Sequence, residues 1–166
     1  MQRRGIETGL AAGLLFATLG IVAWATGRAF IFPSLGPSAF VLAFERRGAG
    51  PRPSRVVGGH LVGAVVGFLA YAALASGVTL TAPPPASLAG LRLVTSGIVS
   101  VAVTSWGMVK TGVVHPPACA TTLIVSLGLL STAADVGIIV VSVVGLVTVH
   151  RGVEARFSRQ ITPSDD

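Results

Sequence analysis

The chain has little charge, few aromatic residues and almost no cysteine. Only 11% of its 166 residues are Asp, Glu, Lys or Arg, 6% are aromatic, and 52% are hydrophobic. The mean hydropathy is +0.81. Soluble domains carry about 25% charged residues, so water is not the solvent for most of this chain. The composition predicts an integral membrane protein.

Cysteine and acidic residues are too scarce for several kinds of site. The single Cys119 can form neither an internal disulfide nor a metal site by itself, so we expect no metal and no other cofactor. An enzyme active site needs acids or bases that converge within the membrane. We expect no enzyme, because the acidic residues do not lie within the apolar stretches. The acidic residues all fall at predicted helix ends or in the tail: Glu7, Glu45, Asp135, Glu154, Asp165 and Asp166.

Two further functions lack their sequence signatures. The net charge is +6, but the Lys and Arg residues lie between apolar stretches without interleaved aromatic residues. A nucleic-acid partner is therefore not expected. The phosphate-binding pattern G-x-x-x-x-G-K-[ST] does not occur in the sequence, which argues against transport driven by ATP.

Long apolar stretches account for most of the chain. They lie at about 9–26, 29–44, 56–80, 88–109, 112–130 and 136–149. A helical crossing needs about 20 apolar residues, so we predict an all-α polytopic protein with about six transmembrane segments. The first stretch lacks a convincing cleavage site and is expected to be retained. Residues 1–166 form a single transmembrane domain, with a short polar tail at 158–166.

The positions of the basic residues predict the orientation. Six crossings with both termini in the cytoplasm leave only Arg28 and Arg92 outside. Ten basic residues then lie inside: Arg3, Arg4, Arg46, Arg47, Arg52, Arg55, Lys110, Arg151, Arg156 and Arg159. This asymmetry agrees with the positive-inside rule and predicts a multi-pass protein of the plasma membrane.

Prolines interrupt the second stretch of each half of the chain. Proline disfavours a helix before it and is tolerated in a first helical turn, so each stretch should be an extended entry followed by a helix. Two interruptions share the frame x-Pro-x-Ala, 79 residues apart: Gly36-Pro37-Ser38-Ala39 and His115-Pro116-Pro117-Ala118. We interpret this as a 3+3 inverted repeat, with repeat 1 at about 5–80 and repeat 2 at about 84–157.

The two interruptions are the predicted binding site. Backbone that is not helical at membrane depth must be buried or line a polar cavity, and two helix N-termini with unpaired N–H groups suit a small anion. His115 is an ionisable group in an apolar stretch, and its protonation could couple anion entry to a proton. The alternative is that the prolines only kink helices and that His115 is a structural histidine bonded to a freed carbonyl.

Four other residues are candidates for a gate or for supporting contacts: His60, Arg55, Thr111 and Cys119. Packing or snorkelling would explain His60 equally well, and Cys119 could simply fill space. We expect Thr121 and Thr122 to bond back to helix carbonyls. Asp135 is expected in the first turn of the last helix, with Thr132 as its capping partner.

These motifs resemble the HPP family of small integral membrane proteins. The resemblance rests on three blocks in order: residues 36–39, the Arg-x-x-x-Gly-His pattern that ends at His60, and His115-Pro116-Pro117-Ala118. It implies a polytopic helical bundle, usually described with four transmembrane segments, and a role in nitrite transport. The basic residues instead favour six crossings.

The expected function is therefore transport or channelling of a small monovalent anion across the bilayer. Nitrite as the substrate follows from the resemblance alone. The alternative is a membrane scaffold or assembly subunit that transports nothing. A bundle this small should need a partner to shield its broken segments from lipid, so we also expect a homo-oligomer, with a dimer as the simplest form.

Overall fold

The computed structural model describes residues 2–45, 50–81 and 83–161. Within these ranges the chain forms α-helices and one π-helical turn, with no strand. The elements are α1 (Gln2–Thr26), α2 (Leu35–Phe44), α3 (Pro53–Ala70), η1 (Tyr71–Ala75), α4 (Leu88–Thr111), α5 (Ala118–Ser126) and α6 (Ala133–Ile161). The all-α fold predicted from the sequence is confirmed.

Four segments are long and apolar enough to cross a membrane: Arg3–Thr26, Pro53–Ala75, Leu88–Thr111 and Ala133–Arg156. The helices α2 and α5 have 10 and 9 residues. At a rise of about 1.5 Å per residue each is about 15 Å long or less, half of a hydrocarbon core of about 30 Å. Neither can cross as a helix alone, so the six crossings predicted from the sequence would require the non-helical residues before α2 and α5 as well.

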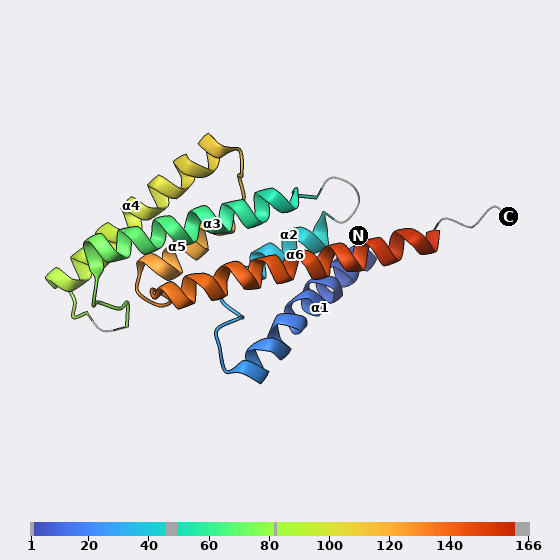
Figure 1. Cartoon of the computed structure of the whole chain (residues 1–166), viewed down its shortest axis with the longest axis horizontal. Helices are drawn as coiled ribbons and strands as arrows, with labels where there is room; N and C mark the ends of the chain where they lie inside the picture. The colour runs from blue at the N-terminus through green and yellow to red at the C-terminus, as the bar shows by residue number, and fades with distance from the viewer. Residues whose placement is uncertain (1, 46–49, 82, 162–166) are drawn as a thin grey trace.

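The two short helices pack against the long ones (Figure 1). The helices α3 and α6 pack against each other and run in opposite directions; α5 packs on α3 and α4, and α2 packs on α1. From the middle of the molecule, α2 runs toward the end where α3 begins, and α5 runs toward the end where α6 begins. The N-terminal ends of the two short helices thus lie inside the bundle.

The starts of the short helices differ from the predicted frame. The helix α2 begins at Leu35, so Pro33 precedes it and Pro37 is its third residue, whereas Pro116 and Pro117 both precede Ala118. The equivalent starts are therefore Leu35 and Ala118, which are 83 positions apart, and the 79-residue offset was wrong. Proline is compatible with the first helical turn, so Pro37 does not mark where α2 begins.

The ends of α6 provide one confirmation and one correction. Thr132 Oγ1 accepts a hydrogen bond from the Asp135 backbone N–H at 3.1 Å, and Asp135 Oδ2 accepts one from the Thr132 N–H at 3.1 Å. This reciprocal cap at the N-terminus was predicted. The helix then continues to Ile161, beyond the apolar stretch at 136–149 and into the expected tail at 158–166. His150 is consequently a buried residue within α6 that pairs with Glu154.

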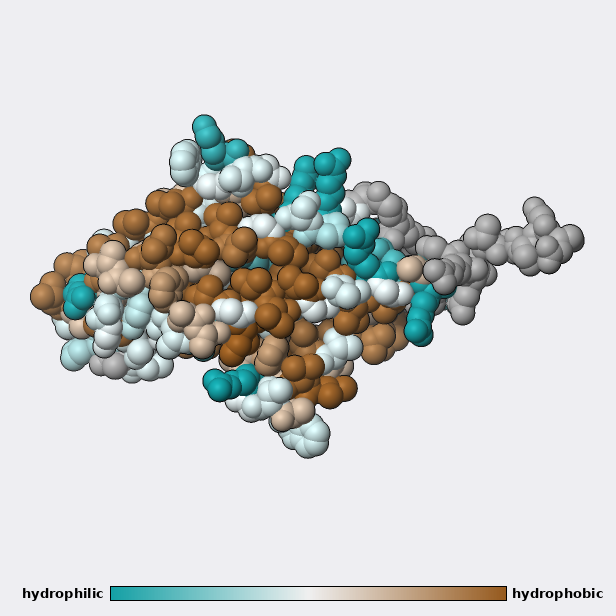
Figure 2. Space-filling model, in the orientation of Figure 1, coloured by the Kyte–Doolittle hydropathy of each residue, from teal (hydrophilic) through white to brown (hydrophobic). Residues whose placement is uncertain are grey.

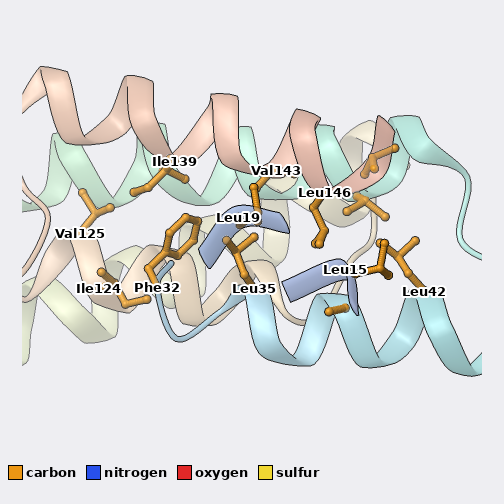
Figure 3. Close-up of a cluster of buried hydrophobic side chains, with 14 residues drawn as sticks. Leu15, Leu19, Phe32, Leu35, Leu42, Ile124, Val125, Ile139, Val143 and Leu146 are labelled. Atoms are coloured by element: carbon orange, nitrogen blue, oxygen red, sulfur yellow. The ribbon is translucent and has the colours of Figure 1, made fainter. Parts of the chain in front are cut away.

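An apolar core joins the short helix α2 to α1, α3, α5 and α6. Figure 3 shows side chains of α1, α2, α5 and α6 that meet at this core, including Leu19, Leu35 and Ile139. The outer surface is also apolar (Figure 2): hydrophobic residues cover most of the visible face, and hydrophilic ones gather toward the end where α3 begins and α6 ends. Large exposed side chains such as Leu10 and Leu88 would contact lipid.

Candidate functional site

Ser38 is the centre of a buried polar cluster. Its Oγ lies 2.9 Å from His60 Nε2 and 3.0 Å from His115 Nε2. It also donates to the Ser34 carbonyl oxygen at 3.1 Å. Ser38 and His60 are 0% exposed and His115 is 2% exposed. The two imidazole rings are tilted, with centroids 5.1 Å apart, so both histidines point at one hydroxyl oxygen.

Thr121 extends this cluster from the other short helix. Its Oγ1 lies 2.6 Å from His60 Nδ1 and 2.6 Å from Ser34 Oγ. Ser34 and Thr121 are both fully buried. The chain of contacts runs from His115 through Ser38, His60 and Thr121 to Ser34, and we call these five residues the Ser-His-Thr cluster. It connects α2, α3 and α5 inside the bundle.

The protons of the Ser-His-Thr cluster have one consistent order. A hydroxyl or a neutral imidazole donates one hydrogen bond, and the cluster has five such groups and five contacts. Because the Ser38 hydroxyl donates to the Ser34 carbonyl, both histidines must donate to Ser38 through Nε2–H. His60 Nδ1 then accepts from the Thr121 hydroxyl, and Thr121 accepts from the Ser34 hydroxyl. Every contact has its donor when both histidines are neutral.

Local sequence explains how these side chains meet. Ser38 and Thr121 are each the fourth residue of their short helix, so one hydroxyl from each helix reaches one ring nitrogen of His60. Glycines on α3 allow this approach: a Cβ on Gly59 would lie 2.8 Å from His115 Cβ, and one on Gly63 would lie 2.7 Å from the Ala118 carbonyl oxygen. The small-residue spacing of α3 therefore serves its contact with α5.

The predicted site residues divide into two groups. The structure brings His115, Ser38 and the gate candidate His60 into direct contact. Ala39 and Ala118 are buried beside them, and Gly36 and Pro117 are half-buried. The remaining candidates are at the periphery: Pro37 and Pro116 are exposed, Arg55 is exposed at the start of α3, Thr111 bonds the Gly107 carbonyl, and Cys119 lies 3.9 Å from Ser105 Oγ.

One expectation about the backbone was wrong. The N–H groups of the first turn of α5 were expected to be unpaired, but those of Ala118, Cys119 and Ala120 donate to the carbonyls of His115, Pro116 and Pro117. A tight first turn satisfies them within three residues. The polar groups available at this end of α5 are consequently side chains rather than backbone N–H groups.

Of the other two members of the cluster, Ser34 was one of the hydroxyl candidates of the first broken segment, but sequence reasoning gave Thr121 a different role. Thr121 was expected to bond its own helix, as Thr122 does through the Ala118 carbonyl. Aligning the two halves on the prolines before each helix, Pro33 with Pro116, would have paired Ser38 with Thr121. A row of hydroxyls on the inner face of α4 was also missed; it comprises Ser96, Ser100 and Thr104, all 0% exposed.

The fold and the buried cluster define an all-helical membrane protein with several apolar helices. A family model described as "HPP, transmembrane region" matches residues 3–159, so the chain belongs to the HPP family of membrane proteins, and the resemblance noted from the sequence is confirmed. No curated protein and no solved structure matches the chain.

Proposed function

We propose that this protein is a transporter or channel for a small monovalent anion, with nitrite as the first substrate to test. The observation that carries the proposal is the meeting of two short-helix N-termini at the buried Ser-His-Thr cluster. Helix N-termini favour negative charge through their dipoles. Membership of the HPP family agrees with a transporter-like role.

Ser38 Oγ marks the position that an anion oxygen would take. Two Nε2–H groups converge on it, from His60 at 2.9 Å and from His115 at 3.0 Å. If the Ser38 side chain rotates, an anion oxygen can accept both bonds, and the Ser38 hydroxyl becomes a third donor. Such bonds to an anion are stronger than the neutral ones they replace.

The same arrangement supports the proposed topology of six crossings as a 3+3 inverted repeat. The order of long, short and long helices occurs twice, and the short helices run in opposite directions from the middle of the molecule. Each second crossing then consists of extended residues plus a half-helix, as in other transporters with inverted repeats. We propose a plasma-membrane location with both termini cytoplasmic, from the distribution of the basic residues.

We also propose a homodimer that covers the outer side of α4 and α5. The non-helical residues 112–117 include the exposed Val114 and Pro116, and such backbone cannot face lipid at membrane depth. An apolar groove of about 510 Å³ lies between the same two helices, α4 and α5, lined by Val94, Gly97, Ile98, Val101, Ala102, Leu123 and Leu127.

Cysteine crosslinking in native membranes tests the dimer. In a Cys119→Ser background, Ile98→Cys is expected to give a crosslinked dimer, because Ile98 lines the groove and is exposed. Leu10→Cys, exposed on α1, serves as the matched control and should remain monomeric. Monomer alone at Ile98→Cys would count against this interface.

One observation favours the alternative of a scaffold that transports nothing. Among the described residues, no fully enclosed side-chain nitrogen or oxygen lacks a hydrogen-bond partner, so the cluster can serve packing alone. In that case replacement of His115 should reduce stability but should change no flux, because there would be none.

Nitrite flux into proteoliposomes decides between the transporter and the scaffold. The wild-type protein is expected to give saturable flux above protein-free vesicles, and His115→Ala should lower it at least tenfold, the effect of about 1.4 kcal/mol in binding or barrier height. Protein-free vesicles correct for nitrous acid that crosses bare lipid, and nitrate, formate and chloride serve as competitors. Absence of flux for all these anions would reject transport and favour the scaffold.

A further inference from the structure

The buried interior offers no fixed charge to balance an anion. Among the described residues, the buried polar side chains are serines, threonines and three histidines; no Asp, Glu, Lys or Arg is buried. A lone ion in a medium of low polarity carries a large desolvation cost unless it is neutralised. Each short-helix N-terminus offers at most the equivalent of about half a positive charge, and the first N–H groups of α5 are already paired with the carbonyls of His115, Pro116 and Pro117. Protonation of a histidine is the remaining way for this site to neutralise a bound anion.

The surroundings of His60 oppose its protonation. Both ring nitrogens are engaged, Nε2 with Ser38 Oγ and Nδ1 with Thr121 Oγ1 at 2.6 Å. In the proton order derived above, the Thr121 hydroxyl donates to Nδ1. A second proton on His60 would turn Nδ1 into a donor, so the Thr121 hydroxyl would lose its acceptor. If Thr121 then donated to Ser34 instead, the buried Ser34 hydroxyl would lose its acceptor in the cluster in turn.

His115 can take a proton without that rearrangement. Its Nε2–H already donates to Ser38, and its Nδ1 has no hydrogen-bond partner in the part of the chain that the structure describes. A proton on Nδ1 breaks no contact of the cluster.

The other titratable groups around His115 do not compensate its charge. His60 of α3 is in ring contact with it, and Cys119 of α5 lies against Ser105 of α4. The nearest cationic side chains along α3 and α4 are Arg55 and Lys110, and both are exposed. The elements α2 and η1 present no charged side chain to it in the described ranges. The helix α1 carries Arg3, Arg4 and Glu7 in its first two turns, and α6 carries Asp135 in its first turn and His150, Arg151, Glu154 and Arg156 in its second half.

We infer that this site moves one proton with each anion, carried on His115 Nδ1, while His60 stays neutral. The inference rests on the proposed transport function. Neutral His115 plus one proton plus the anion gives an imidazolium–anion pair with no net charge added to the bundle. On the other side the anion leaves, Nδ1 releases the proton, and the cluster returns to its original order. The site therefore performs electroneutral symport with a ratio of one to one.

Electroneutral symport and uncoupled anion flow respond to different driving forces. In proteoliposomes with equal nitrite on both sides, one pH unit, acid outside, should drive uptake through wild-type protein at an initial rate above that of protein-free vesicles, toward tenfold accumulation, because one unit corresponds to about 1.36 kcal/mol. A membrane potential of 100 mV, set with potassium and valinomycin, should drive none. An uncoupled anion would respond to that potential by roughly fiftyfold, from about 2.3 kcal/mol per charge.

Three glutamine variants separate the two histidines. His115→Gln can still donate to Ser38 but cannot hold the proton, so the uptake that the pH difference drives above the rate of protein-free vesicles should be lost. His60→Gln should slow flux but keep the ratio of one proton per anion. His150→Gln, on α6 outside the cluster, should keep both rate and ratio. Size-exclusion profiles confirm folding; if His60→Gln does not fold, Thr121→Val tests the same contact with the imidazole retained, and it too should keep the ratio of one.

The outcomes are distinguishable. Wild-type flux that follows the potential and ignores the pH difference would overturn the coupling while leaving anion transport intact. Loss of coupling in His60→Gln, with coupling kept in His115→Gln, would show that His60 carries the proton and would overturn the inference. Flux absent under every condition would reject the proposed function itself.

Discussion

Ser38→Ala is expected to lower anion flux at least tenfold and to destabilise the folded protein by about 2 kcal/mol. Ser38 Oγ is the common acceptor of the His60 and His115 Nε2–H groups. Alanine removes that acceptor and leaves two buried donors unpaired. Each unpaired buried group costs about 1–3 kcal/mol in soluble proteins, and about 0.6 kcal/mol on average for hydrogen bonds in membranes. In the described part of the chain, no other side chain is hydrogen-bonded to both imidazoles.

Ser142→Ala is the matched control for this loss. Ser142 is equally buried, at 0% exposure, but its hydroxyl donates only to the Ile138 carbonyl of its own helix. We expect its flux and its thermal unfolding midpoint in detergent to remain near wild-type values. If the two variants lowered the midpoint equally and neither changed flux, Ser38 would be a packing residue, and the anion position assigned to its oxygen would be wrong.

Gly63→Ala is expected to have the second large effect, a destabilisation of about 1–3 kcal/mol from overpacking, with loss of flux. A Cβ on Gly63 would lie 2.7 Å from the Ala118 carbonyl oxygen and 2.7 Å from Thr122 Oγ1. The carbonyl belongs to the backbone of α5, so the contact can be relieved only by moving that helix. Its first residues carry Thr121 and follow His115, so the shift would separate them from His60.

Gly13→Ala on α1 controls for the change in helix propensity. A Cβ at Gly13 would have nothing within 4 Å, and alanine stabilises a helix interior by up to about 1 kcal/mol over glycine. The unfolding midpoint should therefore fall for Gly63→Ala and hold or rise for Gly13→Ala. Equal midpoints for Gly63→Ala and wild-type protein would contradict the close packing of α3 on α5.

Much of the site followed from residue types alone. A histidine beside two prolines in an apolar stretch is costly unless it has partners, and this singled out His115, which lies in the buried cluster. His60 was only a gate candidate, because a histidine on a helix is explained equally well by packing. Its two hydrogen bonds depend on α2 and α5 approaching α3 from different directions, which spacing along one helix does not reveal.

The prolines predicted two interrupted segments but not the residue at which each short helix begins. Proline disfavours the helical conformation in the residue before it, but it is tolerated in the first turn of a helix. A helix can therefore begin on either side of Pro37. The start at Leu35 places Ser34 and Ser38 one turn apart, where the Ser38 hydroxyl reaches the Ser34 carbonyl. Packing of Leu35, which is 0% exposed, in the apolar core is consistent with this start.

The sequence by itself determined the helical membrane class, the two interrupted segments and the cap at Thr132 and Asp135, because composition, proline chemistry and capping act over a few neighbouring residues. Tertiary structure alone decided that Ser34, Ser38, His60, His115 and Thr121 form one hydrogen-bonded cluster. Its contacts join residues separated by as many as 87 positions, and they form only because glycines on α3 let α5 approach closely. Local sequence fixes which groups need partners, and helix packing selects the partners they receive.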